Sequence, residues 1–473
     1  MQKIIIKNFG PVKDAEIEIK KTLILIGEQA SGKSTIAKLI YFFRTLPEEL
    51  KIHLLSKFVY PYLDEKKICK IKFDFEDDII KTIKQKFNDC FSHIYNSSHF
   101  KIEYFYKNPD KSDSTYILLE VNENKGLTAK FDSDSREHLG KKLSQALTRI
   151  NPLVPEFDFN NILKSHLLGI ETIGRKNNLF IIAGRNATVS YSRTFEKQLF
   201  ADLSNSIDQS KSYDETLMLK FINRVDEIKN EFEAYNFIEK KSFENIFDNL
   251  KSHNNEEENF IFKTFLENSN LILKGSYELA NDSESIKLNG LKEKYVLLKN
   301  ASTGQQEVIR ILQDLFLALG QQNFFRVIEE PEAHLFPEAQ KLLVEIFACF
   351  VNYHKEYAEG KEEYQDNKLI ITTHSPYILT AYNNLLFANR VIQKNPDLEK
   401  EVYKHVNKDC ILDSDNFSAY SLKIVQNEDD EYYQNIVNPK TGLISQNFLD
   451  SVSDTLNSEF HNLYDLYTKS FAR

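Results

Sequence analysis

Apolar residues at the start of the chain fall into three short runs that predict successive β-strands at 2–7, 15–20 and 22–27. Residues 15–19 alternate between apolar and charged side chains, as in a half-exposed strand, whereas 22–26 form the continuous apolar run of a buried central strand. The period then changes to that of a helix from residue 32 to about residue 44. Its predicted apolar face carries Ile36, Leu39, Ile40 and Phe43.

Further along, the two periods are mixed. Residues 79–94 predict a helix, while 101–106, 116–121 and 180–182 predict strands. The stretch 190–268 is largely helical and polar without sustained heptads, which indicates a compact lobe rather than a long coiled coil. After residue 290, short apolar strands alternate with helices, and 447–469 has the single apolar face of a docking helix.

The chain has 473 residues, including 35 Phe and 23 Tyr, enough for two or three packed lobes. Its net charge of −10 argues against a surface coated for nucleic-acid binding, although a local basic groove stays open. The four cysteines form no Cys-x-x-Cys pair, and Cys90 with His93 lacks a second pair to complete a zinc site. Since there is neither a signal sequence nor an apolar run of the roughly 20 residues that span a bilayer, we expect a cytoplasmic protein with reduced thiols.

The segment GEQASGKS at 27–34, the phosphate loop, lies between the buried strand and the amphipathic helix. Its glycines let backbone N–H groups point at phosphates, and the helix N-terminus adds partial positive charge. Lys33 can bridge the β- and γ-phosphates of ATP, and the Ser34 hydroxyl can bind Mg²⁺. The alternative is a glycine turn with a chance Lys-Ser. The predicted nucleotide-binding residues here are Gly27, Glu28, Gln29, Ala30, Ser31, Gly32, Lys33, Ser34 and Thr35.

An apolar run at 324–328 ends in Glu329 and Glu330, the first residues of the acidic turn 329–332. A strand parallel to the first would bring both carboxylates to the phosphate side of the sheet. Glu329 can hold Mg²⁺ directly or through water, although Asp is usual at that position, and Glu330 can orient and polarise the attacking water. In isolation the same pattern is typical of a solvated turn.

Residues 301–306, ASTGQQ, form the signature turn, which precedes an apolar helical face. Ser302 can cap that helix, and the capped N-terminus can face a γ-phosphate bound by another subunit. His374 follows an apolar strand at 369–372 and precedes a Ser-Pro turn, where it can hydrogen-bond the γ-phosphate or the lytic water. The alternatives are a plain helix cap and a core histidine, and the order of the motifs favours the catalytic interpretation.

These motifs together resemble the ABC-type ATPase heads of SMC and RecF-like proteins, and more narrowly the overcoming-lysogenization-defect (OLD) ATPases among the AAA family ATPases of prokaryotic defence. Residues 27–34 resemble a Walker A motif, and 329–335 resemble a Walker B motif running into a D-loop. In the signature turn the resemblance assigns ATP contacts to Ser302, Gly304 and Gln305, and it makes His374 the switch histidine.

The hairpin at 6–12 also fits the resemblance, and 180–185 is similar to a strand-to-arginine element of defence ATPases, with a surface arginine at Arg185 as the alternative. The implied fold class is α/β, an ABC-type P-loop NTPase head with a mixed sheet, flanking helices and a large inserted lobe. The expected parts are 1–48 and 290–395 for the two halves of the head, 49–289 for the inserted α+β and helical lobe, and 396–473 for C-terminal strands and the docking helix.

The resemblance further implies a head-to-tail homodimer, or a higher homo-oligomer, with ATP and Mg²⁺ between subunits. Lys33 of one copy and Ser302 of the other would contact one γ-phosphate, and the catalytic residues would be Lys33, Glu330 and His374. In size and layout the chain is similar to the ATPase subunits of the PARIS and Septu systems. We therefore expect a sensor or scaffold subunit of anti-phage defence that hydrolyses ATP and controls a separate nuclease or toxin.

Two alternatives remain: a RecF/SMC-like DNA-repair ATPase that binds DNA, and a nucleotide-gated clamp that barely turns over. A built-in nuclease is a further possibility, because many OLD proteins carry a C-terminal TOPRIM domain. Asp413 and Asp415 imitate its Asp-x-Asp, but no Glu-Gly element lies between His374 and that point. Because half of a metal site is not a site, we do not expect nuclease activity.

Overall fold

The structure is a computed structural model that describes residues 2–58, 73–93, 99–106, 116–122, 126–132, 136–137, 140–141, 143, 178–190, 212–235, 241–250, 256–280, 283–290, 294–319, 324–353, 367–424, 431–445 and 458–464. A six-stranded sheet at the centre has the order β15-β14-β3-β13-β12-β7. Its strands are β3 (Thr22–Gly27), β7 (Asn178–Ile181), β12 (Phe325–Glu329), β13 (Lys368–Thr373), β14 (Phe417–Leu422) and β15 (Tyr433–Asn435). All neighbours in this sheet are parallel except β15, which pairs antiparallel with β14.

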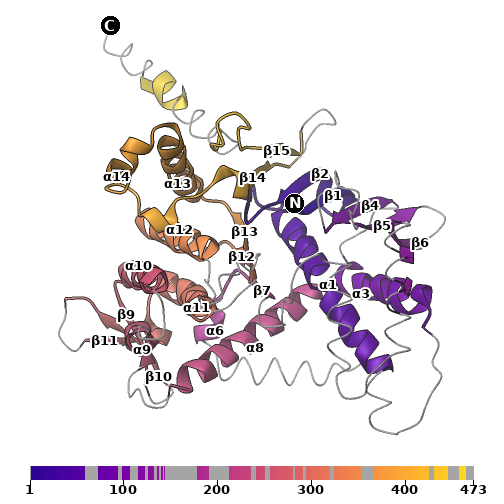
Figure 1. Cartoon of the computed structure of the whole chain (residues 1–473), viewed down its shortest axis with the longest axis horizontal. Helices are drawn as coiled ribbons and strands as arrows, with labels where there is room; N and C mark the ends of the chain where they lie inside the picture. The colour runs from indigo at the N-terminus through magenta and orange to yellow at the C-terminus, as the bar shows by residue number, and fades with distance from the viewer. Residues whose placement is uncertain are drawn as a thin grey trace.

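Two antiparallel sheets flank this central sheet (Figure 1). The first has the order β2-β1-β4-β5-β6, and the second has the order β11-β10-β9-β8. The first comprises β1 (Gln2–Phe9), β2 (Val12–Ile19), β4 (Phe100–Phe105), β5 (Tyr116–Asn122) and β6 (Gly126–Phe131). The second comprises β8 (Lys241–Ser242), β9 (Gly275–Ala280), β10 (Ser283–Leu288) and β11 (Tyr295–Leu297).

Helices cover both faces of the central sheet and bridge to the smaller ones (Figure 1). They are α1 (Lys33–Phe58), the π-helix η1 (Glu76–Ile80), α3 (Lys81–Phe91), α6 (Ala187–Ser190), α8 (Tyr213–Glu233), α9 (Phe243–Leu250), α10 (Glu256–Leu273), α11 (Thr303–Ala318), α12 (Pro337–Asn352), α13 (Pro376–Lys394) and α14 (Glu399–Val402). Short 3-10 turns are η4 (Leu298–Asn300), η5 (Pro396–Leu398), η6 (Lys408–Cys410) and η7 (Ser414–Asn416). Among the described residues no helix is both long and apolar enough to cross a bilayer.

The continuous apolar run of β3 is buried because its two faces enter different cores. Leu23 and Leu25 pack into the core shared with α1 and the β1–β6 sheet. Ile24 and Ile26 pack into the core formed with α11, α12 and α13. The α/β fold class with a mixed sheet and flanking helices is thereby confirmed, whereas the domain boundaries stay a prediction.

Helix α1 continues past its predicted end near Arg44 to Phe58 and contains Pro47. Proline lacks the N–H that would bond to the carbonyl four residues earlier. That carbonyl, of Phe43, instead accepts a hydrogen bond of 2.9 Å from the Tyr106 hydroxyl. The helix also continues because Leu50 and Leu54 keep its apolar face buried.

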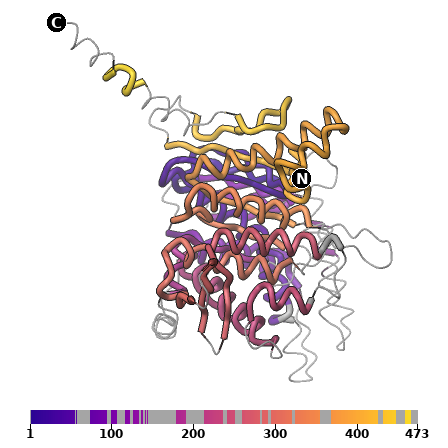
Figure 2. The backbone as a smooth tube through the Cα atoms, turned by 90° about the vertical axis from the view of Figure 1, so that its left-hand side faces the viewer, coloured from indigo at the N-terminus to yellow at the C-terminus, as the bar shows by residue number. Residues whose placement is uncertain are grey.

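The predicted docking helix at 447–469 is described only at 458–464, which is helical. Its side chains there are exposed, and the segment trails away from the body of the protein (Figure 2). The remainder of that prediction lies outside the described residues.

Candidate functional site

The predicted motifs meet at one edge of the central sheet because its parallel strands end there together. Ile371 of β13 is in register with Ile24 of β3 on one side and with Ile328 of β12 on the other. The phosphate loop after β3, the acidic turn after β12 and His374 after β13 therefore share the carboxyl edge of the sheet. This is the edge at which open α/β sheets bind ligands.

Two positions of the phosphate loop need glycine, because atoms from the C-terminal part of the chain lie where a side chain would begin. Gly27 has φ +154°, and a Cβ there would lie 1.9 Å from the Leu422 carbonyl oxygen. Gly32 has φ +94°, and a Cβ there would lie 2.6 Å from the Tyr432 hydroxyl. That hydroxyl donates a 2.5 Å hydrogen bond to the Ser31 carbonyl oxygen. Leu422, at the end of β14, and Tyr432, just before β15, thus form one wall of the loop, a role that the sequence did not reveal.

Lys33 is buried and its ammonium folds back onto the phosphate loop. It donates to the carbonyl oxygens of Gly27 at 3.0 Å and Glu28 at 2.6 Å. Burial lowers the pKa of Lys33 to about 8, while the negative charges of Glu330, Glu332 and Glu28 partly oppose that decrease. An ammonium held among carbonyls at a helix N-terminus can be turned toward a triphosphate, whose charge would favour the protonated form.

The residues predicted to hold Mg²⁺ fit that ion. Oε1 of Glu329 and Oε2 of Glu332 are buried and lack a hydrogen-bond partner. Buried carboxylate oxygens are costly unless a cation or a donor binds them. Ser34, partly exposed at the start of α1, can add its hydroxyl. The described part of the chain contains no cluster of three or more His, Cys, Asp or Glu side chains for a metal, so phosphates and water would complete the shell, as is usual for Mg²⁺.

Glu330, in the acidic turn, and His374, after β13, have neighbouring side chains. Oε1 of Glu330 lies 3.3 Å from Nε2 of His374, and the backbone N–H of Glu330 donates to the Thr372 carbonyl at 2.8 Å. Glu332 holds the backbone at this histidine in place. Its Oε1 accepts hydrogen bonds from the His374 backbone N–H at 2.8 Å and from the Thr373 hydroxyl at 2.6 Å. Sequence reasoning assigned no role to Glu332. Glu330 itself has φ +44°, an uncommon conformation for a non-glycine residue.

Arg185, after β7, is fully buried, so the alternative of a surface arginine is wrong. Its guanidinium donates to the carbonyl oxygens of Glu329 at 2.7 Å and Glu330 at 3.0 Å. Nε lies 3.2 Å from Oε2 of Glu307 on α11. The sequence could not show this burial because the partners lie more than a hundred positions downstream.

The signature turn starts α11 with a capping box. Ser302 Oγ accepts from the Gln305 N–H at 3.4 Å, and Gln305 Oε1 accepts from the Ser302 N–H at 3.0 Å. A Cβ on Gly304 would lie 2.5 Å from the His334 carbonyl oxygen, so only glycine lets this turn pack against the loop after the acidic turn. Ser302 is exposed, and within the described residues its side chain hydrogen-bonds only to Gln305. The structure therefore groups Lys33, Glu330 and His374 at one edge of the sheet and leaves Ser302 exposed.

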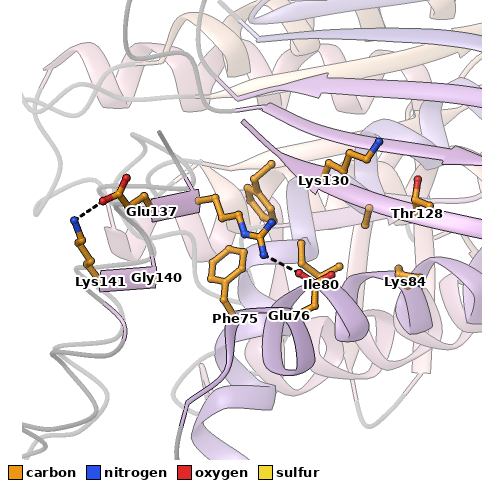
Figure 3. Close-up of a pocket in the computed structure, with 12 residues that line it drawn as sticks. Phe75, Glu76, Ile80, Lys84, Thr128, Lys130, Glu137, Gly140 and Lys141 are labelled. Carbon is orange, nitrogen blue, oxygen red and sulfur yellow. Dashed lines mark hydrogen bonds and ion pairs between the residues drawn. The ribbon is translucent and has the colours of Figure 1, made fainter. Parts of the chain in front are cut away.

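Other predicted or conspicuous features lie away from this edge. Asp413 caps the 3-10 turn η7 by accepting from the Asp415 N–H at 3.0 Å. A cavity of about 830 Å³ lies beside β6, where Arg136 pairs with Glu76 at 2.9 Å (Figure 3). None of the residues that line it belongs to the motifs, so it is not the predicted nucleotide site.

Comparison with protein families matches residues 1–379 to the AAA ATPase domain family, so the chain belongs to that family. Three solved structures are similar over 80% of this chain. An SMC head bound to the C-terminal winged-helix domain of ScpA has 16% identity, 90% of its own chain covered and a TM-score of 0.36. The SMC head domain from Thermotoga maritima has 11% identity, 90% covered and a TM-score of 0.33. The Smc head with an extended coiled coil bound to the C-terminal domain of ScpA, derived from Pyrococcus furiosus, has 13% identity, 92% covered and a TM-score of 0.33. Comparison with curated proteins gives no match.

Proposed function

We propose that the chain binds ATP with Mg²⁺ at the phosphate loop and hydrolyses it when the signature turn of a second copy closes over the γ-phosphate. One observation carries this proposal: Lys33, Glu330 and His374 are grouped at one edge, while the capped Ser302 projects to the exterior. An ABC-type arrangement of two copies would bring the two halves together. Membership of the AAA ATPase domain family supports nucleotide binding and hydrolysis.

Within this proposal, each side chain has a definite task. The Lys33 ammonium turns from its loop carbonyls to the β- and γ-phosphates. Ser34 and Glu329 would hold Mg²⁺, which would neutralise phosphate charge when bound. Glu330 accepts a proton from the attacking water, and His374, 3.3 Å from that carboxylate, donates a hydrogen bond to the γ-phosphate or the water.

Two exposed aromatic rings, each a few residues after a motif of the site, support closure by a second copy. Phe336, which follows the acidic turn, is 77% exposed, and Tyr377, three residues after His374, is 54% exposed. Aromatic residues are enriched at protein–protein interfaces, where burying such rings contributes much of the binding energy. The proposed interface therefore has apolar anchors beside its nucleotide.

Mixing two inactive variants tests the composite site. Lys33→Ala removes the phosphate contact of a copy's own site, and Ser302→Arg blocks the site of its partner. Each variant alone should be inactive, whereas a heterodimer of the two has one site with both lesions and one intact site. We expect phosphate release to reappear on mixing. Mixtures as inactive as the separate variants would refute the composite site.

We further propose that the chain is a cytoplasmic sensor or scaffold subunit of an anti-phage system that controls a separate nuclease or toxin. This proposal is supported by the resemblance of the motifs and of the layout of the chain to the ATPase subunits of such systems. The net charge of −10 does not favour the alternative of a DNA-repair ATPase. Purified protein that cleaves nucleic acid by itself, and still does so as Lys33→Ala, would contradict it.

A further inference from the structure

Arg185 and Glu307 form a buried bridge between the acidic turn and the helix that begins at the signature turn. Both side chains are almost fully buried, with exposures of 0% and 2%. Glu307 accepts hydrogen bonds from the backbone N–H groups of Arg185 at 3.0 Å and of Asn186 at 3.2 Å. In return the Arg185 Nε–H donates to the Glu307 carbonyl oxygen at 3.1 Å.

The other end of the guanidinium fixes the backbone that carries the two acidic side chains. Nη1 donates to the carbonyl oxygens of Ile182 and Glu329, at 2.8 and 2.7 Å, and Nη2 donates to that of Glu330 at 3.0 Å. A planar fork with several fixed donors holds its acceptors in one geometry. Because Glu330 has φ +44°, its orientation depends on such support.

We propose that Arg185 is a positioning residue which, with Glu307, couples the two nucleotide sites of a dimer. The inference rests on the proposed function. Glu307 lies on α11 five positions after Ser302, which would contact the ATP of the partner, whereas Glu330 would act on the ATP of its own copy. Movement of α11 on engaging the partner's ATP therefore shifts Glu307, and Arg185 transmits that shift to the Glu330 backbone.

A second buried bridge on the same helix provides a matched control. Asp314, further along α11, accepts from Arg326 of β12 at 2.6 Å and from Arg224 of α8 at 3.1 Å. Both Arg326 and Asp314 are fully buried. Arg326 thus resembles Arg185 in burial and in its link from α11 to the central sheet, but it lies at the start of β12, away from Glu329 and Glu330.

The experiment compares Arg185→Lys and Glu307→Gln with Arg326→Lys. Steady-state phosphate release against ATP concentration gives kcat and the Hill coefficient, binding of a fluorescent ATP analogue gives affinity, and thermal unfolding reports folding. The wild type should show a Hill coefficient above one. Arg185→Lys and Glu307→Gln should lower kcat about tenfold to a hundredfold, with little change in affinity, and bring the Hill coefficient to one.

Arg326→Lys should lower the unfolding temperature by as much as Arg185→Lys does. It should nevertheless keep the Hill coefficient of the wild type. The double variant Arg185→Lys with Glu307→Gln should be no worse than the poorer single variant, because the two residues act as a unit. A wild-type Hill coefficient of one, or equal losses of cooperativity in the Arg185 and Arg326 variants, would overturn the coupling. A wild type without ATPase activity would instead contradict the proposed function.

Discussion

Replacing Tyr432 by Phe removes one hydroxyl from the wall of the phosphate loop and little else. That hydroxyl is the donor to the Ser31 carbonyl at 2.5 Å, and Tyr432 is buried. A hydrogen bond of this kind contributes about 0.5–1.5 kcal/mol, and an unpaired buried carbonyl costs about 1–3 kcal/mol. The loop that bears the loss must be ordered when phosphates bind, so we expect ATP binding to weaken by about 1 kcal/mol, or roughly fivefold.

Calorimetric titration with ATP, together with phosphate release, checks this expectation. Because no hydrogen bond or ion pair joins Tyr432 to Glu330 or His374 among the described residues, kcat should change less than twofold. Tyr420→Phe is the matched control, since the Tyr420 hydroxyl is also buried and accepts a 3.0 Å hydrogen bond, from the Glu18 N–H. Unchanged ATP affinity in Tyr432→Phe, or equal weakening in Tyr420→Phe, would refute the reasoning.

Three further predictions concern the same edge of the sheet. Glu330→Gln removes the proposed base and should slow phosphate release about 10²–10⁴-fold. Light scattering should then detect an accumulating ATP-bound dimer. Equal rates of phosphate release in the wild type and this variant would favour a nucleotide-gated clamp. The pKa of Lys33 is near 8, so ATP affinity should be greatest below pH 8 and fall by at most about tenfold per pH unit above it. An ATP affinity that stays constant between about pH 7 and 9.5 would contradict this. Gly304→Ala forces a methyl group to 2.5 Å from the His334 carbonyl oxygen, so it should abolish ATP-dependent dimerisation but not ATP binding. Thr303→Ala, at an exposed position, is the control. A Gly304→Ala protein that still dimerises with ATP would count against the proposed interface.

Local sequence pattern was sufficient for the parts of the site that follow directly from a strand. The phosphate loop, Glu330 and His374 each come immediately after an apolar run, and parallel pairing of those runs brings them together. The period of α1 did not reveal its full length, because the Phe43 carbonyl left without a partner by Pro47 is satisfied by Tyr106, which follows β4 and lies far away in the sequence. Whether Ser302 completes a neighbour's site stays a prediction.

Contacts between distant segments were beyond the reach of the pattern. The sequence left Arg185 open between a strand-to-arginine element and a surface arginine, yet the structure buries it, because Glu307 and the carbonyls of the acidic turn surround it. Tyr432 belongs to no motif, and the pairing of β14 with β3 and of β15 with β14 brings its hydroxyl to the phosphate loop. Such roles depend on tertiary packing, which periodicity and spacing do not encode.

The match to the AAA ATPase domain family ends at residue 379, but the residues that surround the phosphate loop extend beyond it to Leu422 and Tyr432. A fragment cut there would retain every motif and lose Leu422 and Tyr432, which leaves one flank of the glycine loop bare. Related chains with different tails could therefore adjust how tightly they retain ATP without altering a single motif residue. Swapping tails between such chains, and following the nucleotide dissociation rate, would reveal how much of the affinity is set outside the shared domain.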